Sequence, residues 1–360
     1  MAVADLAREL VSIPSHEDET AAGDAISEWL RAETDADVTR DGAGNVIARR
    51  GSDDESSRSL ALVGHHDVVP PDDGQVDDDG AYVVTERDCR LYGRGSADMK
   101  GADAAMLYAF RDADPAGELF FASFVGEEVG GTGSRHAIDE GFSPDCAIVA
   151  EGSTGYSAPG VTDVVVAHKG RRASTVTARG ESAHASEVES GVNAIYRACD
   201  AVDVLCDLDL PTVEVLGHEL SGSLAITEIE GGSAWNVIPG ECSVTVDERT
   251  VPGERADLSR VESVGGVTVE VDQDWPPMAC DDATFADTVL DAATSAQDDV
   301  PEQVVKPHAT DAGWLAQAGT TCVVCGPAEL GQAHTADESV DLAVLERCRE
   351  IYRSVAEATW

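Results

Sequence analysis

Apolar residues recur at helical spacing in some stretches of the chain and form short continuous runs in others. Leu6 and Leu10, and later Ile26 and Leu30, lie four residues apart, which predicts two amphipathic helices near the start of the chain. The apolar run at 59–63 is too short for a helix of ordinary length and predicts a buried strand. The same patterns predict helices at 102–111 and 133–140, and buried strands at 119–125 and 145–150.

The pattern changes after Val164, where strands with alternating apolar and polar residues become common. A second change, at Cys280 and Asp281, restores the earlier pattern of helices and apolar strands. We therefore expect an α/β domain with a mostly parallel sheet flanked by helices, formed by residues 1–168 and 281–360, and an inserted α+β domain formed by 169–280. The strands expected from Val164 onward are 164–167, 173–178, 223–229, 241–246 and 267–271, with one helix at 192–205. The segments 282–295, 301–305, 321–324 and 341–359 return to an α/β pattern, in which 321–324 is a strand and 341–359 the terminal helix.

Ionisable residues directly follow three of the predicted buried strands. His65 and Asp67 follow the first strand, Glu127 and Glu128 the second, and Glu151 the third. In open α/β sheets, ligands gather beyond the carboxyl ends of the strands, so these side chains are expected to converge at one edge. Each set alone has an ordinary explanation as a solvated loop. Adjacent carboxylates are costly to bury without a cation, however, and three such sets favour a metal site.

Asp98 and His334 are two further candidates, because each lies in a loop that precedes a helix. Asp98 belongs to the glycine-rich segment 93–101, where the ordinary expectation is that it caps the following helix. His334 lies in a polar loop before the C-terminal helix and would mean little alone. The candidate metal ligands are therefore His65, Asp98, Glu128, Glu151 and His334.

This ligand set offers nitrogen and oxygen donors and no cysteine. Two zinc ions about 3.5–4 Å apart, bridged by a carboxylate and a water, suit such a set. Manganese, cobalt or iron can use similar ligands. Glu127, beside Glu128 but pointing elsewhere, is the candidate general base for the water. The predicted chemistry is metal-dependent amide hydrolysis without a covalent intermediate.

The charge balance is strongly acidic, with 69 Asp and Glu against 24 Lys and Arg, a formal net charge of −45. Nucleic acids and anionic membranes are therefore not expected as partners. The acidic residues are spread along the whole chain, which indicates a folded surface adapted to high salt, where the Debye length is about 3 Å at 1 M. We predict unfolding or loss of activity at low salt.

The nine cysteines are irregularly spaced, so no disulfide framework is expected. Cys322 and Cys325 form a CxxC pair within an apolar strand, where buried thiols are the expected state. No basic segment followed by an apolar core begins the chain, and no apolar run approaches the roughly 18 residues of a membrane span. The expected location is the cytoplasm.

The motifs around these residues resemble those of the di-zinc amidohydrolase and exopeptidase family of acetylornithine deacetylase, succinyl-diaminopimelate desuccinylase, aminoacylase and carboxypeptidase G. The resemblance covers nearly the full chain and keeps the family's motif order. The motifs are Gly64-His65-x-Asp67-Val-Val-Pro70, Gly93-Arg-Gly-x-x-Asp98-Met-Lys-Gly101, Gly126-Glu127-Glu128, Glu151-Gly152 and Ala333-His334-x-x-x-Glu338.

The resemblance implies that Asp98 bridges two zinc ions. It implies that His65 and Glu151 complete one metal site, and that Glu128 and His334 complete the other. Glu127 would be the base, and Asp67 the partner that tunes the metal-site histidine. The implied fold is a zinc-peptidase-like α/β domain with an inserted ferredoxin-like lid through which the protein forms a homodimer.

Three residues of the expected lid also match family motifs. His184, in Gly180-Glu-Ser-Ala-His184, resembles a histidine that reaches the neighbouring subunit's active site and stabilises the oxyanion there. Asn236 and Arg249 resemble residues that grip the substrate, since a guanidinium can hold a carboxylate through two hydrogen bonds. The simpler alternatives are that His184 faces solvent and that Arg249 pairs with a nearby acid. The segment Thr310–Gly313 weakly resembles a substrate loop of the deacetylase branch.

The family resemblance implies a small N-acyl amino acid as substrate. The leading hypothesis is desuccinylation of N-succinyl-diaminopimelate in lysine biosynthesis, closely followed by deacetylation of acetylornithine. Hydrolysis of carrier-protein-linked lysine or ornithine, or of dipeptides, remains open, because the catalytic motifs do not distinguish these substrates. Two classes outside catalysis also remain: a metal-binding member of the fold without activity, and an acidic binding module without metal.

Overall fold

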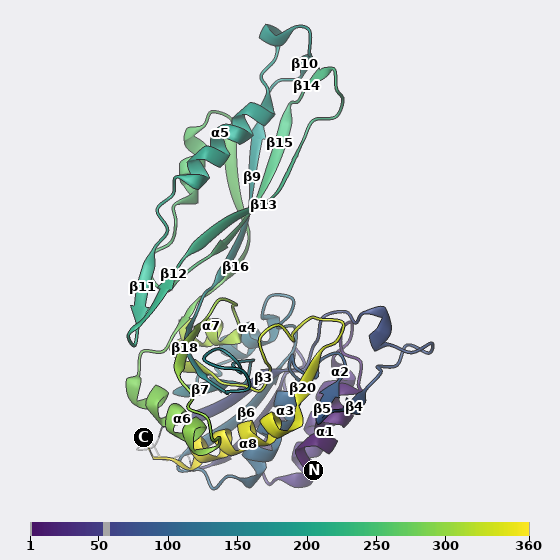
Figure 1. The fold of residues 1–360 in the computed structure, drawn as a ribbon, viewed down its shortest axis with the longest axis vertical. Coiled ribbons are helices and arrows are strands. Elements are labelled where there is room, and N and C mark those ends of the chain that lie inside the picture. Colours follow the sequence, from purple (N-terminus) through teal and green to yellow (C-terminus); the bar gives the residue numbers. More distant parts are fainter. Residues whose placement is uncertain (1, 53–57, 360) are drawn as a thin grey trace. The chain divides into compact units, whose positions relative to one another are not determined.

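The computed structural model describes residues 2–52 and 58–359, which form two units (Figure 1). Unit 1 contains the described residues up to Ala167, together with Met278–Lys306 and those from Thr310 onward. Unit 2 contains His168–Pro277 and Pro307–Ala309.

Unit 1 is built on a nine-stranded mixed sheet. Its strands, in the order in which they pair, are β1 (Asp37–Arg40), β2 (Val46–Gly51), β6 (Glu118–Phe124), β3 (Leu60–His65), β7 (Cys146–Val149), β19 (Thr321–Val324), β8 (Val164–His168) and β17 (Met278–Ala279), with β18 (Gln303–Lys306) beside β8. The four central strands, β6, β3, β7 and β19, run parallel, whereas β2 and β8 pair with them in the antiparallel sense. Every residue of β3 is buried, as expected for a strand covered on both faces.

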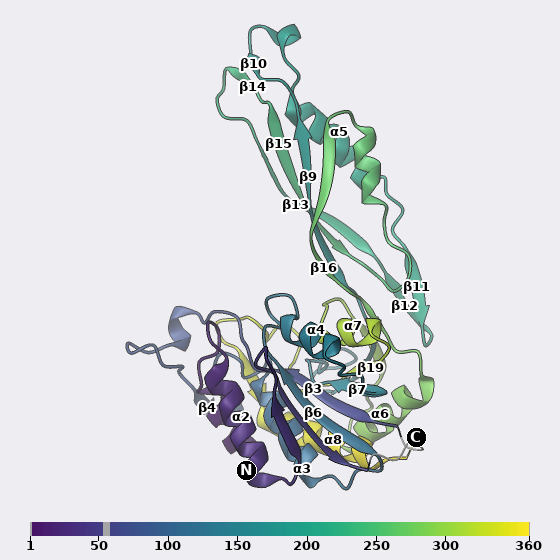
Figure 2. The same cartoon turned by 180° about the vertical axis from the view of Figure 1, so that it is seen from behind.

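Helices cover both faces of this sheet (Figures 1 and 2). They are α1 (Ala2–Val11), α2 (Thr20–Glu33), α3 (Lys100–Asp112), α4 (Thr132–Asp139), α6 (Ala283–Ser295), α7 (Asp311–Gln317) and α8 (Leu342–Glu357). On one face α3 packs against α1 and α8, and α8 packs against α6; on the other face α4 and α7 pack together. A small antiparallel sheet adds β4 (Thr85–Arg87), β5 (Arg90–Tyr92) and β20 (Ser339–Asp341), after the short helix η1 (Asp73–Gln75).

The core of unit 1 fixes the ends of the central strands. Val63, Phe124 and Val149, near the carboxyl ends of β3, β6 and β7, belong to one buried apolar cluster. Phe124 also packs edge-to-face on Phe142, with 5.8 Å between ring centroids. Because close-packed interiors resist displacement, polar residues that follow these strands start from well-defined positions.

Unit 2 contains an antiparallel sheet with one covered face. Its strands pair in the order β13 (Ser223–Gly231), β15 (Glu241–Arg249), β9 (Arg171–Arg179) and β16 (Val267–Trp275), and α5 (Ala194–Cys206) and η3 (Leu258–Ser263) pack on them. Burial alternates along β15, because only one face carries the core. Numbered along the chain, the strand order is 2-3-1-4, the arrangement of a ferredoxin-like sheet. Two small antiparallel strand pairs complete the unit. β10 (Ala183–His184) pairs with the distant β14 (Val237–Ile238), and β11 (Thr212–Val215) forms a hairpin with β12 (His218–Ser221); η2 (Val188–Ser190) follows β10.

The predicted fold class is confirmed: unit 1 is an α/β structure with a parallel centre, and unit 2 is an α+β insertion. The helix predicted at 102–111 is longer, and its N-cap is Met99, without a side-chain capping bond. The expectation that Asp98 caps this helix was therefore wrong, because its carboxylate is engaged by two imidazoles instead.

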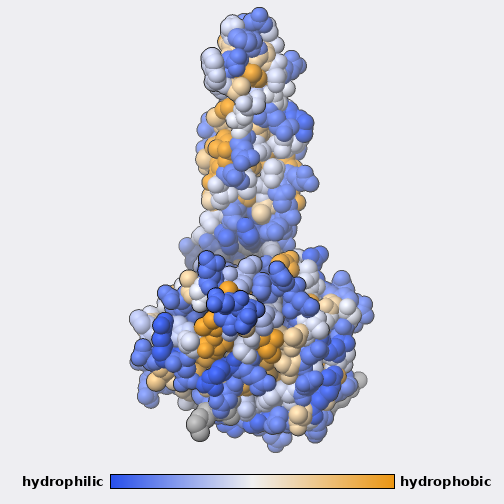
Figure 3. All heavy atoms as spheres, turned by 90° about the vertical axis from the view of Figure 1, so that its right-hand side faces the viewer, coloured by the Kyte–Doolittle hydropathy of each residue, from blue (hydrophilic) through white to orange (hydrophobic). Residues whose placement is uncertain are grey.

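All nine cysteines are free, and Cys322 and Cys325 are buried as predicted. Among residues 2–52 and 58–359, no helix is both long and apolar enough to cross a lipid bilayer. The face drawn in Figure 3 is mostly hydrophilic, with apolar groups interrupting it on both units. This surface accords with the excess of acidic residues along the chain.

Candidate metal centre

The carboxyl ends of three parallel strands bring the predicted ligands to one edge of the unit 1 sheet. β3 ends at His65, which lies opposite Phe124 at the end of β6. On its other side, Val63 of β3 lies opposite Val149 at the end of β7. Glu127 and Glu128 therefore leave the sheet beside His65, and Glu151 leaves it from the neighbouring strand.

His65 and Glu151 form the buried half of the centre. Nε2 of His65 lies 3.3 Å from Oε1 of Glu151 and 3.1 Å from Oδ1 of Asp98. The His65 side chain is only 1% exposed, so its ring is fixed by its surroundings.

His334 and Glu128 form the open half. Nε2 of His334 lies 3.0 Å from Oε1 of Glu128 and 3.2 Å from Oδ2 of Asp98. The His334 side chain is 51% exposed, so a small molecule can reach the centre from this side. Asp98 thus directs one carboxylate oxygen to each histidine, which is the arrangement that a bridging ligand requires.

These residues meet the requirements of a divalent cation. Ligand atoms of His65, Asp98 and Glu128 lie within 4.8 Å of one another, as do those of His65, Glu127 and Glu151. Imidazole nitrogen and carboxylate oxygen are ligands of zinc, and manganese and cobalt accept them as well. Glu127 belongs to the second of these groups, so its carboxylate lies at the same centre as the candidate ligands.

Asp67 holds the two sides of the site together. Its Oδ1 accepts a hydrogen bond from the backbone N–H of Glu127 at 3.1 Å, and its Oδ2 accepts one from the N–H of Glu128 at 3.0 Å. Nδ1 of His65 lies 3.3 Å from Oδ1 of Asp67 and 3.1 Å from its carbonyl oxygen. A carboxylate on the second ring nitrogen fixes the orientation of a ligating histidine and raises its basicity.

The acids around the two histidines raise the pKa of both imidazole rings. Burial lowers the pKa of His65, but hydrogen bonds with Asp67, Asp98 and Glu151 outweigh it and raise this pKa well above its usual value. Hydrogen bonds to Asp98 and Glu128 raise the pKa of His334 to about 10. The acids around the two rings therefore already favour positive charge at both positions.

Glu127 has the environment of a proton carrier. Burial raises the pKa of its carboxyl group well above the usual value, and the carboxylates of Asp311, Glu151 and Glu128 raise it further, whereas His65 lowers it. A carboxylate whose pKa is shifted toward neutrality both accepts and returns a proton more readily than an ordinary glutamate.

Three charged groups near the centre have no role in the motif-based interpretation. Nζ of Lys306 donates to Oε2 of Glu151 at 3.4 Å and to the carbonyl oxygen of Gly152 at 3.0 Å. Lys306 is only 6% exposed. The chain contains only three lysines, and this scarcity is the one feature of the sequence that could have indicated a role for Lys306. Arg94 and Glu338 form a buried ion pair, and although both lie in recognised motifs, nothing in the sequence links them.

Asp311, in the segment that weakly resembles a substrate loop, is also buried near the centre. Its Oδ1 accepts a hydrogen bond from the hydroxyl of Ser134 at 2.5 Å, and burial raises its pKa to about 7. Thr310 caps the following helix α7 through the N–H of Ala312. Asp311 therefore belongs to the acidic surroundings that shift Glu127.

The predicted lid residues all lie in unit 2, where they divide into two groups. His184 and Asn236 are neighbours, because the N–H of Ala185 donates to the carbonyl oxygen of Asn236 at 2.9 Å. His184 is exposed, and its Nδ1 lies 2.7 Å from the Ser186 hydroxyl. Arg249 lies at the far end of β15, about 26 Å along the strand from its start.

The guanidinium of Arg249 contacts a nearby acid. Its Nε donates to Oδ1 of Asp247 at 2.7 Å, and its second nitrogen reaches Oδ2 of Asp247 at 3.4 Å. The alternative of a local ion pair therefore describes its contacts in this structure. A substrate carboxylate would have to displace Asp247 to use both donors.

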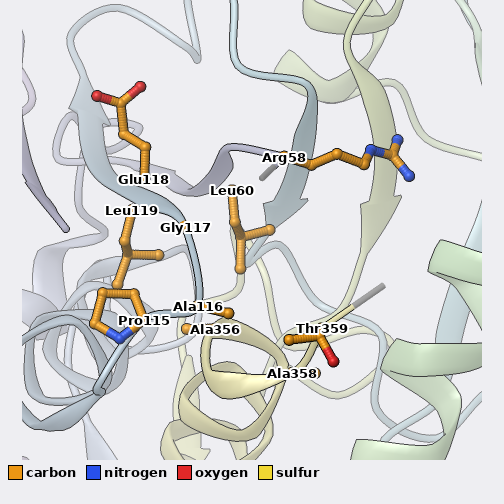
Figure 4. Close-up of a pocket in the computed structure, with 10 residues that line it drawn as sticks. All are labelled: Arg58, Leu60, Pro115, Ala116, Gly117, Glu118, Leu119, Ala356, Ala358 and Thr359. Atoms are coloured by element: carbon orange, nitrogen blue, oxygen red, sulfur yellow. The ribbon is translucent and has the colours of Figure 1, made fainter. Parts of the chain in front are cut away.

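A separate pocket lies at the opposite end of the unit 1 sheet (Figure 4). It is lined by Leu60 and Glu118, the first residues of β3 and β6, and by Pro115 and Thr359. Because β3 extends about 16 Å from Leu60 to His65, this pocket is distinct from the metal centre.

A family model described as Peptidase family M20/M25/M40 matches residues 61–358. An acetylornithine deacetylase of Pectobacterium atrosepticum is 31% identical over 331 residues, which cover 86% of this chain and 82% of that protein. The structure of aminopeptidase PepT from Bacillus cereus is similar, with a TM-score of 0.81, 20% identity, and coverage of 99% of this chain and 97% of that one. The Bacillus subtilis YXEP protein, described as a dinuclear metal binding peptidase, has a TM-score of 0.71 at 16% identity, with coverage of 99% and 96%.

Proposed function

Because the chain belongs to peptidase family M20/M25/M40, we propose that it hydrolyses the amide bond of an N-acyl amino acid, with N-acetylornithine as the substrate. The observation that carries this proposal is the sharing of Asp98 by two histidine–carboxylate pairs, with Glu127 beside them. The acetylornithine deacetylase at 31% identity favours an acetyl over a succinyl substituent. Desuccinylation of N-succinyl-diaminopimelate therefore becomes the second candidate rather than the first.

We propose two zinc ions as the resident metals, with cobalt or manganese as substitutes. His65 and Glu151 would hold one ion, Glu128 and His334 the other, and Asp98 both. When bound, such ions polarise the amide carbonyl and lower the pKa of a water molecule. The donor set supports this assignment, since each half pairs an imidazole nitrogen with a carboxylate oxygen.

Glu127 transfers the proton during the reaction. The carboxylate of Glu127 accepts a proton from the attacking water as the new C–O bond forms, and it delivers that proton to the amide nitrogen as the C–N bond breaks. The products are a carboxylate and a free amine. Asp67 keeps Glu127 in place through the backbone N–H of that residue.

Unit 2 supplies the proposed lid. His184 would stabilise the oxyanion in the active site of a second subunit, which makes the working form a homodimer. Asn236 would bind the substrate beside His184. Arg249 would bind the substrate carboxylate in place of the carboxylate of Asp247. The neighbouring positions of His184 and Asn236 support their acting together.

A substrate panel tests the proposal. The protein is stripped with a chelator, reconstituted with Zn²⁺ or Co²⁺ at high salt, and assayed with N-acetylornithine, N-succinyl-diaminopimelate and a dipeptide. We expect the highest kcat/KM with N-acetylornithine, and no activity without added metal. A preference for the succinyl compound or the dipeptide would replace the proposed substrate, and inactivity toward all three with two ions bound would overturn the hydrolase assignment.

A further inference from the structure

Arg94 and Glu338 form a buried ion pair that joins the two loops carrying Asp98 and His334. We propose that Glu338 is a positioning residue: its carboxylate holds the backbone before Asp98 so that this side chain faces both halves of the centre. The inference rests on the proposed metal-dependent function. It goes beyond that function because it assigns a role to two motif residues that are not among the candidate metal ligands.

The carboxylate of Glu338 makes three hydrogen bonds. Its Oε1 accepts from the backbone N–H groups of Ala97 at 2.9 Å and of Asp98 at 3.1 Å. Its Oε2 accepts from the guanidinium of Arg94 at 2.6 Å. The side chains of Glu338 and Arg94 are 0% and 2% exposed, so water does not compete for these bonds. Hydrogen bonds to a buried charge are short and strong, which suits them to fixing a loop.

Glu338 is also tied to the loop of His334 by its own backbone. Its N–H donates to the carbonyl oxygen of Thr335 at 3.3 Å, and its carbonyl oxygen accepts from the N–H of Gly93 at 3.2 Å. The next residue, Ser339, begins β20 and pairs with Tyr92 of β5. Glu338 therefore connects the paired strands β5 and β20 with the backbone of Asp98.

This connection sets the geometry that the centre needs. Oδ2 of Asp98 lies 3.2 Å from Nε2 of His334, although the two residues come from different loops. The helix that follows Asp98 gives its side chain no capping role, so the backbone conformation before α3 determines where the carboxylate points. Metal-site partners outside the ligand set typically change metal affinity or activity by about 10- to 100-fold when they are removed.

The alternative is that Glu338 only neutralises the buried Arg94. A pair of double variants separates these roles, because both remove the ion pair. Arg94→Met with Glu338→Gln retains an amide oxygen that can accept from Ala97 and Asp98. Arg94→Met with Glu338→Met has nearly the same shape and no acceptor. Positioning predicts that only the second double variant loses metal affinity.

The measurement is calorimetric titration of the chelator-stripped full chain with Co²⁺ at high salt, together with the visible absorption of the bound ion. We expect the Gln double variant to match Arg94→Met, and the Met double variant to bind Co²⁺ about 10- to 100-fold more weakly with an altered spectrum. Equal affinities and spectra in the two double variants would overturn the inference. If wild-type protein does not bind two Co²⁺ ions, the proposed function fails instead, so the two failures are distinguishable.

A shorter acid provides a second test if the Met double variant does not fold. Glu338→Asp keeps the charge beside Arg94 but withdraws the oxygen from Ala97 and Asp98. We expect weaker Co²⁺ binding by a variant that keeps the circular dichroism spectrum of the folded wild-type protein. Wild-type affinity in this variant would assign Glu338 to charge neutralisation alone.

Discussion

Replacement of Asp67 by asparagine tests how the site is held together. In the wild-type protein the two oxygens of Asp67 accept hydrogen bonds from the N–H groups of Glu127 and Glu128. Asparagine has one oxygen, and its NH₂ group would face the other N–H donor. The variant therefore loses one bond to a charged acceptor and leaves a buried N–H without a partner.

The size of the effect follows from these contacts. The Asp67 side chain is 5% exposed, so water cannot replace the lost acceptor. A hydrogen bond to a charged group contributes about 1.5–3 kcal/mol, and an unsatisfied buried donor costs about 1–3 kcal/mol. We expect Asp67→Asn to lower the free energy of unfolding by about 2–4 kcal/mol. Since Asp67 also orients His65, we expect kcat/KM to fall by about 10- to 100-fold.

Urea unfolding at constant high salt measures the stability, and deacetylation of N-acetylornithine by the zinc-reconstituted protein measures kcat/KM. The exposed Asp209 supplies a matched control, and Asp209→Asn should change stability by less than about 0.5 kcal/mol. An Asp67→Asn protein with wild-type unfolding and wild-type kcat/KM would refute the role assigned to these contacts.

Four further outcomes are expected. Glu127→Gln should reduce turnover by about 10²- to 10⁴-fold with the metal content unchanged, measured by kinetics and elemental analysis, and an active variant rules out this residue as the base. His184→Ala should lower the rate of hydrolysis without loss of bound metal, and sedimentation of the wild-type protein should find a dimer; a wild-type protein that is fully active as a monomer contradicts the role of His184 across subunits. Dialysis from multimolar to dilute salt should unfold the protein, as followed by circular dichroism, because the net charge of −45 is then unscreened; full activity in dilute buffer argues against salt adaptation. Burial raises the pKa of Asp103 to about 7, so between pH 5 and 7 the folded state retains a proton that the unfolded state has lost, and wild-type stability falls as pH rises. Relative to Asp103→Asn, the wild type should lose about 2 kcal/mol over this interval in urea unfolding, and parallel curves for the two proteins would refute the shift.

The sequence determined the elements that carry the site. Burial leaves apolar residues at helical spacing in a helix and in a short continuous run in a buried strand. The strand that ends at His65 and the helix at Ala2–Val11 could therefore be predicted from local residues. Polar residues after buried strands indicated where the metal ligands would gather, because the carboxyl ends of parallel strands all lie at the same edge of a sheet. His65, Asp98, Glu128, Glu151 and His334 do meet at that edge.

The tertiary structure alone decided how these residues are oriented and supported. The partners Arg94 and Glu338 are 244 residues apart, and their contact depends on the pairing of β5 with β20, which has no signature in either segment. Asp98 could equally have capped a helix, until the histidines of two distant segments were in place beside its carboxylate. Local patterns report which side chains are buried, whereas the free energy of a buried charge depends on which partner the fold brings to it.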